Sequence, residues 1–133
     1  MLLLADTEPV VTGAELQPCF DESAKALRLA GIPSSLSADA SFELPAPDTS
    51  ALYTAFETML EAAMPYLSRV TFYLGNETAG KIDFRFRAEL KPGSPADDIL
   101  AQANRAAAEA EKEIPGAGIR FDIGVIGEGG PDL

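Results

Sequence analysis

Residues 70–90 constrain the fold of this chain more than any other segment. Val70, Phe72 and Leu74 alternate with polar neighbours, and after residues 75–80 a second run alternates apolar with charged side chains. Because successive strand residues point to opposite faces, the two runs predict a β-hairpin with one buried face and one charged face. The second run has apolar Ile82, Phe84, Phe86, Ala88 and Leu90, and charged Asp83, Arg85, Arg87 and Glu89.

Amphipathic helices are predicted before this hairpin. Apolar residues at spacings of three and four indicate a first helix over roughly 13–30, with Leu16, Phe20, Ala24 and Leu27 on one face. Thr12 and Glu15 have the spacing of a capping box, although Pro18 leaves open a start nearer Gln17. A second helix, capped from residues 48–50 and ended or kinked by Pro65, has one apolar face. That face contains Leu52, Phe56, Met59, Leu60, Ala63 and Leu67.

A third helix is predicted over roughly 96–113, where Asp97 and Asp98 favour its positive N-terminus. Weaker alternation over 32–38 and clear alternation over 119–126 indicate two more strands. The order is therefore α-β-α-β-β-α-β. It predicts an α/β (α+β) two-layer sandwich, with three helices on one face of a four-stranded sheet that is mixed or mostly antiparallel. The expected shared core contains Val70, Phe72, Phe84, Phe86, Phe121 and Ile123.

Composition excludes several classes of function. The 133 residues contain no His, which excludes Ser-His-Asp and Cys-His catalysis, and the single Cys19 excludes an intrachain disulfide. With 10 basic and 21 acidic residues the net charge is −11, which repels nucleic acid and anionic membrane surfaces. The apolar opening at residues 1–5 is far shorter than a membrane span of about 20 residues. We expect a single cytoplasmic domain over 1–133, or a fragment of a larger signalling protein.

Glu57 and Glu61 are the first candidates for chemistry, because two carboxylates one helical turn apart can share Mg²⁺ or act as acid and base. The alternative is a solvated helix face in an acidic protein, which is the more common situation of Glu. Asp97 and Asp98 beside Ser94 could also ligate a metal, but acidic residues favour a first helical turn in any case.

Other candidates have structural interpretations. Cys19 has no basic neighbour in the sequence, so we expect a buried, inert thiol. Arg85 and Arg87 are interpreted as cross-strand charge pairs with Asp83 and Glu89 on the solvent face. The glycine-rich residues 127–130 follow a strand but precede no helix, so they do not form a phosphate-binding loop.

The segment from Leu2 to Leu90 resembles the ATP-binding catalytic domain of sensor histidine kinases, the GHKL or Bergerat fold. The resemblance is carried by residues 12–16 opening a helix that ends at 26–32, by Leu44-Pro45, and by the helix over 52–63. That helix is similar to the family's N-box helix, which carries a Glu and, four residues on, an Asn that holds Mg²⁺ against ATP. By this resemblance Glu57 corresponds to the Glu, whereas Glu61 replaces the Asn.

The chain also departs from the family. No Asp-x-Gly box follows the second hairpin strand, where Lys91-Pro92-Gly93 stands, and no His is present for autophosphorylation. The resemblance therefore implies a degenerate ATP-binding domain acting in two-component signal transduction, without catalytic activity and with no catalytic residues. No cofactor is expected; Mg·ATP would bind only if the site at Glu57 and Glu61 is retained. The alternative is a non-enzymatic α/β protein–protein interaction module.

A protein partner or a homodimer is expected in either case, because the sheet has two edges. The strand over 119–126 has few charges on its outer face, and an uncovered edge invites pairing. A second candidate surface is the small-residue face of the third helix, with Ala101, Ala106, Ala108 and Ala110. We expect no binding to nucleic acid and no membrane insertion.

Overall fold

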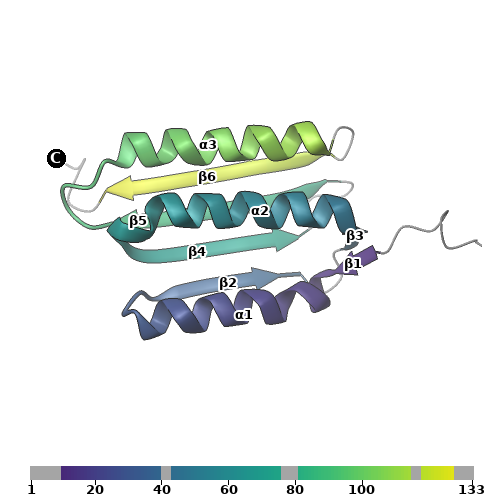
Figure 1. Ribbon diagram of the computed structural model, residues 1–133, viewed down its shortest axis with the longest axis horizontal. Coiled ribbons are helices and arrows are strands. Elements are labelled where there is room, and N and C mark those ends of the chain that lie inside the picture. The colour runs from purple at the N-terminus through teal and green to yellow at the C-terminus, as the bar shows by residue number, and fades with distance from the viewer. Residues whose placement is uncertain (1–9, 40–42, 76–80, 115–117, 128–133) are drawn as a thin grey trace, which may run out of the picture.

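A four-stranded sheet and three α-helices form the computed structural model, which describes residues 10–39, 43–75, 81–114 and 118–127 (Figure 1). Two short strands and one 3-10 turn complete this part of the chain. In chain order the elements are β1 (Val10–Thr12), α1 (Gly13–Leu29), β2 (Ser34–Ala38), β3 (Glu43–Pro45), α2 (Ala46–Ala63), η2 (Met64–Tyr66), β4 (Leu67–Gly75), β5 (Ile82–Leu90), α3 (Ala96–Glu113) and β6 (Ile119–Gly127).

The main sheet is mixed, which is one of the two arrangements predicted. Its strand order is β2-β4-β5-β6; β4 and β5 pair as the expected antiparallel hairpin, whereas β2 with β4 and β5 with β6 are parallel. Helices α2 and α3 provide the two long crossovers that parallel neighbours require. Strands β1 and β3, of three residues each, pair with each other outside the main sheet. They were not predicted, because three residues are too few to show an alternation of apolar and polar side chains.

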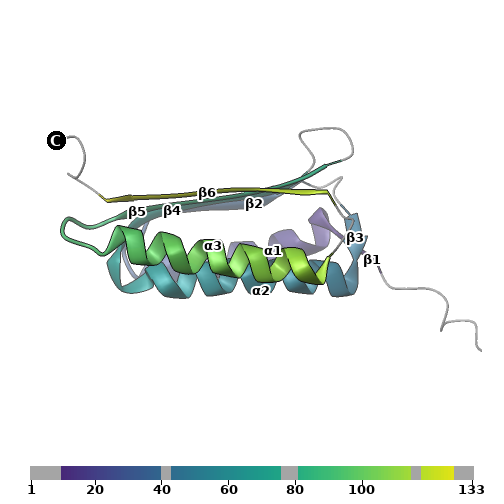
Figure 2. The ribbon, with the colours of Figure 1, turned by 90° about the horizontal axis from the view of Figure 1, so that it is seen from above.

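All three helices cover the same face of the sheet, which confirms the predicted two-layer sandwich (Figure 2). Helix α1 lies beside β2, α3 runs along β6, and α2 lies between them (Figure 1). The even-numbered residues of β5 therefore point into the helix layer. The opposite face of the sheet, called the open face below, carries no helix in the described ranges (Figure 2).

The core lies between the two layers and contains most of the residues predicted for it. Phe72, Phe84, Phe86 and Val70 are buried. The phenylalanine rings of the strands contact one another and a ring of α2. The centroid of Phe72 lies 4.5 Å from that of Phe56 on α2 and 5.0 Å from that of Phe84. Phe121 and Ile123 also pack against this core but remain half-buried, because β6 is an edge strand.

The predicted capping box fixes the start of α1. The Thr12 N–H donates to Glu15 Oε1 at 2.9 Å, and the Glu15 N–H donates to Thr12 Oγ1 at 3.2 Å. The helix therefore begins at Gly13 rather than near Gln17, and it includes Pro18. This box satisfies two N–H groups that a helix N-terminus otherwise leaves unpaired.

Helix α2 begins earlier than predicted, because Pro45 rather than residues 48–50 takes the N-cap position. Thr49 is buried in the first turn and its hydroxyl donates to the Pro45 carbonyl at 3.2 Å. The helix ends at Ala63, before Pro65, and Leu67 begins β4 instead of extending the helical face. Helix α3 has the predicted bounds.

Within the ranges that the structure describes, no helix combines the length and hydrophobicity needed to cross a bilayer.

Substitution of Phe84 by Ala should cost about 3–5 kcal/mol of unfolding free energy, because the ring is fully buried between β4, β6 and the helices. Urea denaturation of both proteins measures this difference. A loss below about 1 kcal/mol would place the ring outside the core and contradict the hairpin register.

Candidate functional site

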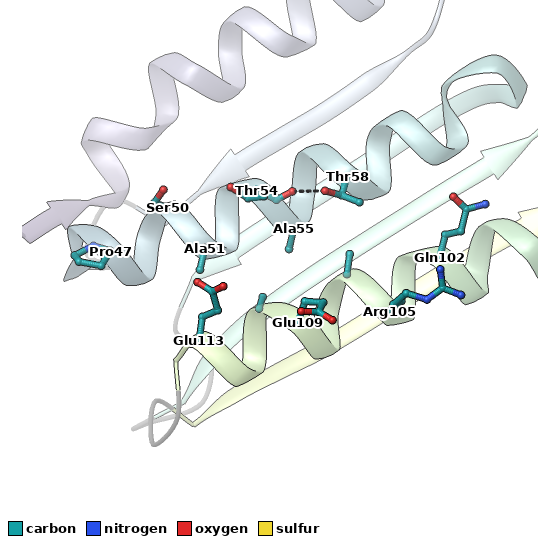
Figure 3. Close-up of a pocket in the computed structure, with 12 residues that line it drawn as sticks. Pro47, Ser50, Ala51, Thr54, Ala55, Thr58, Gln102, Arg105, Glu109 and Glu113 are labelled. Atoms are coloured by element: carbon teal, nitrogen blue, oxygen red, sulfur yellow. Dashed lines mark hydrogen bonds between the residues drawn. The ribbon is translucent and has the colours of Figure 1, made fainter.

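A groove of about 600 Å³ lies between α2 and α3. The two helices run antiparallel along it, with Pro47 and Glu113 at one end and Thr58 and Gln102 at the other (Figure 3). Residues four apart on each helix line it in rows, since such residues share a face. The rows are Ser50, Thr54 and Thr58; Pro47, Ala51 and Ala55; Gln102, Ala106 and Ala110; and Arg105, Glu109 and Glu113.

The chemistry of the groove favours contact with a small-residue or apolar surface. Its floor is made largely of alanine methyl groups, and the Thr58 hydroxyl is already engaged, donating to the Thr54 carbonyl at 2.9 Å. Arg105 is the one cation among the lining residues, and Glu109 and Glu113 stand beyond it on the same helix (Figure 3). An anion such as a nucleoside triphosphate would be repelled there by the carboxylates of Glu109 and Glu113.

Glu57 and Glu61, the residues predicted to bind nucleotide or metal, do not line this groove. Both are exposed on α2, one turn apart as their spacing requires. Among the described residues no third acidic, Cys or His side chain joins them in a group that could hold a metal ion. As the structure stands, the pair is a solvated face of α2.

The remaining sequence candidates are also dispersed. Asp97 and Asp98 are exposed in the first turn of α3, and the Ser94 hydroxyl donates to the Lys91 carbonyl. The expectation of a buried Cys19 is wrong: the thiol is exposed, because it precedes Phe20 by one residue and so lies about 100° away from the buried face of α1. Of the glycine-rich run 127–130, residues 128–130 lie outside the described residues.

Two charged side chains of β5, Arg87 and Glu89, form cross-strand ion pairs on the open face with residues of β6 and β4. Arg87 donates two hydrogen bonds to the carboxylate of Asp122 on β6, at 2.9 and 3.0 Å. On the other side of β5, Glu89 Oε1 lies 3.8 Å from Arg69 Nε of β4. The Arg85 guanidinium stacks 5.6 Å from the centre of the Tyr73 ring. The sequence could not identify these partners, because they depend on the register between strands that are distant in the chain.

The Arg87 side chain passes over Gly124 on its way to Asp122. Arg87 stands opposite Gly124 in the β5–β6 register, and a Cβ at position 124 would lie 2.9 Å from Arg87 Cδ. The side chain therefore crosses the bare glycine backbone to reach Asp122. Its hydrogen bonds lower the pKa of Asp122 below the ordinary 3.8, although partial burial opposes the shift.

Asp83 differs from its expected position on the charged solvent face, because only 3% of it is exposed. Its strand neighbours are Gly75 on β4 and Arg120 on β6, and the Tyr73 ring overlies Gly75. This corner of the open face is packed, whereas Thr71, Glu89 and Arg120 are exposed.

Sequence reasoning missed the groove, although its signal is present. The four-residue rows of hydroxyl and small side chains in α2, and of small and charged side chains in α3, can be seen in the sequence. What the sequence does not contain is the antiparallel contact of α2 with α3 that brings these rows together. The small-residue face predicted on α3 is also divided: Ala106 and Ala110 line the groove, whereas Ala101 and Ala108 are exposed and do not.

Comparison of the chain with protein-family models, with curated proteins and with solved structures finds no match. The function is therefore inferred from the residues of this chain.

Substitution of Asp122 by Asn should reduce the loss of stability in acid. The folded-state pKa of Asp122 is depressed, so its contribution is present above the ordinary value of 3.8 and is lost as the pH falls through the lower folded value. Both partners are nearly half-exposed, so the contribution is about 0.2–1 kcal/mol. Denaturant titrations on either side of this window measure the effect, and identical pH profiles for the two proteins would contradict it.

Substitution of Gly124 by Ala should raise the pKa of Asp122 towards its ordinary value, because the added methyl group displaces Arg87. Carboxyl chemical shifts followed by NMR through the acid range report this value directly. An unchanged titration of Asp122 would show that Arg87 reaches its partner by another path.

Proposed function

We propose that this chain is a degenerate relative of the ATP-binding domain of histidine kinases, which has no catalytic activity, binds nucleotide weakly or not at all, and acts in signal transduction by contacting a protein. The partner is either another protein or a second copy of the chain. The proposal joins the family resemblance in residues 2–90 to the chemistry of the described surface.

The separation of the carboxylates from the groove carries the proposal. In the resembled family, the N-box helix carries a Glu and, four residues on, an Asn that holds Mg²⁺ against the bound nucleotide. In this chain Glu57 and Glu61 are exposed outside the α2–α3 groove, and the groove itself has two carboxylates and one cation. A Mg·nucleotide held by Glu57 and Glu61 would therefore make no contact with the groove that could add to its affinity.

The absence of His from the sequence supports the same conclusion. Without a phosphoacceptor His, the chain cannot carry the phosphoryl group of a histidine kinase. A domain of this kind can still transmit a signal through the surfaces it presents, and the alanine-lined groove and the exposed edge of the sheet are two such surfaces.

Titration with Mg·ATP and Mg·ADP should leave the thermal midpoint unchanged. A retained site would stabilise the fold by about 2.7 kcal/mol at a hundredfold excess of nucleotide over its Kd, which is readily detected.

The variants Glu57→Gln and Glu61→Gln, with Glu111→Gln as a matched control at an exposed helical position outside the groove, identify the source of any shift. A stabilisation by nucleotide that disappears in the first two variants and persists in the third would overturn the proposal and establish a working N-box site.

A further inference from the structure

The two edge strands of the main sheet, β2 and β6, differ in how far other residues cover their free backbone groups. At β2, the side-chain amide of Gln17 donates to the Leu36 carbonyl at 3.1 Å and accepts from the Ala38 N–H at 2.9 Å. This amide takes the place of a neighbouring strand. Strand β2 is also short, with five residues, three of them Ser. These are the features by which proteins protect an edge.

The opposite edge, β6, has none of these protections. It contains nine residues without Pro or Lys, and it pairs with β5 from Ile119 to Gly127 without a bulge. No other strand lies beside it in the described ranges. A long, regular edge of this kind is a template for pairing with another strand.

The core-facing side chains of β6 show what the missing neighbour would cover. Phe121, Ile123 and Val125 stand opposite Phe84, Phe86 and Ala88 of β5. The three β5 residues have no exposed surface, whereas their β6 partners are only partly buried. On the open face, Ile126 is 53% exposed. The row of core-facing apolar side chains on β6 is therefore not fully covered along this edge.

We propose that β6 pairs antiparallel with β6 of a second copy of this chain, centred on Ile123, to form a continuous eight-stranded sheet. In this register Ile123 faces its own copy, Phe121 faces Val125, Asp122 faces Gly124, and Arg120 faces Ile126. The core-facing Phe121, Ile123 and Val125 then each face an apolar side chain, Ile119 faces Gly127, and all nine residues of β6 take part. This inference deepens the proposed function and rests on its protein-contact component.

The sequence of β6 distinguishes this register from its neighbours. Centring on Asp122 places two carboxylates opposite each other, which is destabilising. Centring on Phe121 leaves Val125 and Ile126 without a strand residue opposite. The register centred on Ile123 avoids facing like charges and uses the full strand.

A pair of substitutions at Ile126 tests the pairing and its register together. Ile126→Glu places a carboxylate opposite Arg120 of the second copy, and Ile126→Lys places a like charge there. Two symmetry-related pairs should change the dimer Kd by roughly 2- to 30-fold in each direction, tighter for Glu and weaker for Lys. General repulsion in a chain of net charge −11 predicts the opposite order, because Glu adds to the charge and Lys reduces it.

Sedimentation equilibrium across the micromolar range, at low and high ionic strength, measures these constants. Because Ile126 is exposed, the monomers of both variants, diluted below the dimer Kd, should keep the melting temperature of the wild-type monomer. A wild-type dimer that Glu tightens and Lys weakens supports the proposal. A monomer at every concentration and salt overturns it, as does a dimer that neither substitution affects or that shows the opposite order. None of these outcomes bears on nucleotide binding, which the Mg·ATP titration decides separately.

Discussion

A continuous row of phenylalanine rings holds the helix layer to the sheet. It runs from Phe20 of α1 to Phe56 of α2, then to Phe72, Phe84 and Phe121 on three successive strands, with centroids 4.5–5.4 Å apart. Offset and edge-on contacts of this kind add to the stability gained from burial alone. Because the rings all lie on one side of the sheet, they determine which face the helices cover and which face stays open.

The one-sided core also explains where the surfaces for interaction arise. The open face is stabilised by charge pairs such as Arg87–Asp122, which leave it polar and exposed in part. The row of rings ends at Phe121 on the edge strand, where the apolar surface is only half covered. On the outer side of the helix layer, small residues of α2 and α3 leave a groove. The edge and the groove are both consequences of where the core ends.

The alternating and helical periods in the sequence were sufficient to predict the layers, the hairpin and the bounds of α3. Thr12 and Glu15 likewise predicted their capping box, because the interaction spans only three residues. The features that the sequence did not predict depend on distant contacts. The partner of Arg87, the burial of Asp83 and the α2–α3 groove all depend on which strands and helices become neighbours. Cys19 is an exception, since the helical period already placed it off the buried face.

The aromatic row couples the helix layer to the sheet, and a double-mutant cycle between Phe56 of α2 and Phe72 of β4 measures that coupling. Their ring centroids are 4.5 Å apart, and both side chains are fully buried. Unfolding free energies of the wild type, Phe56→Leu, Phe72→Leu and the double variant should give a coupling of about 0.5–1.5 kcal/mol. Effects that simply add, to within about 0.3 kcal/mol, would show that the two rings act independently and would contradict the account.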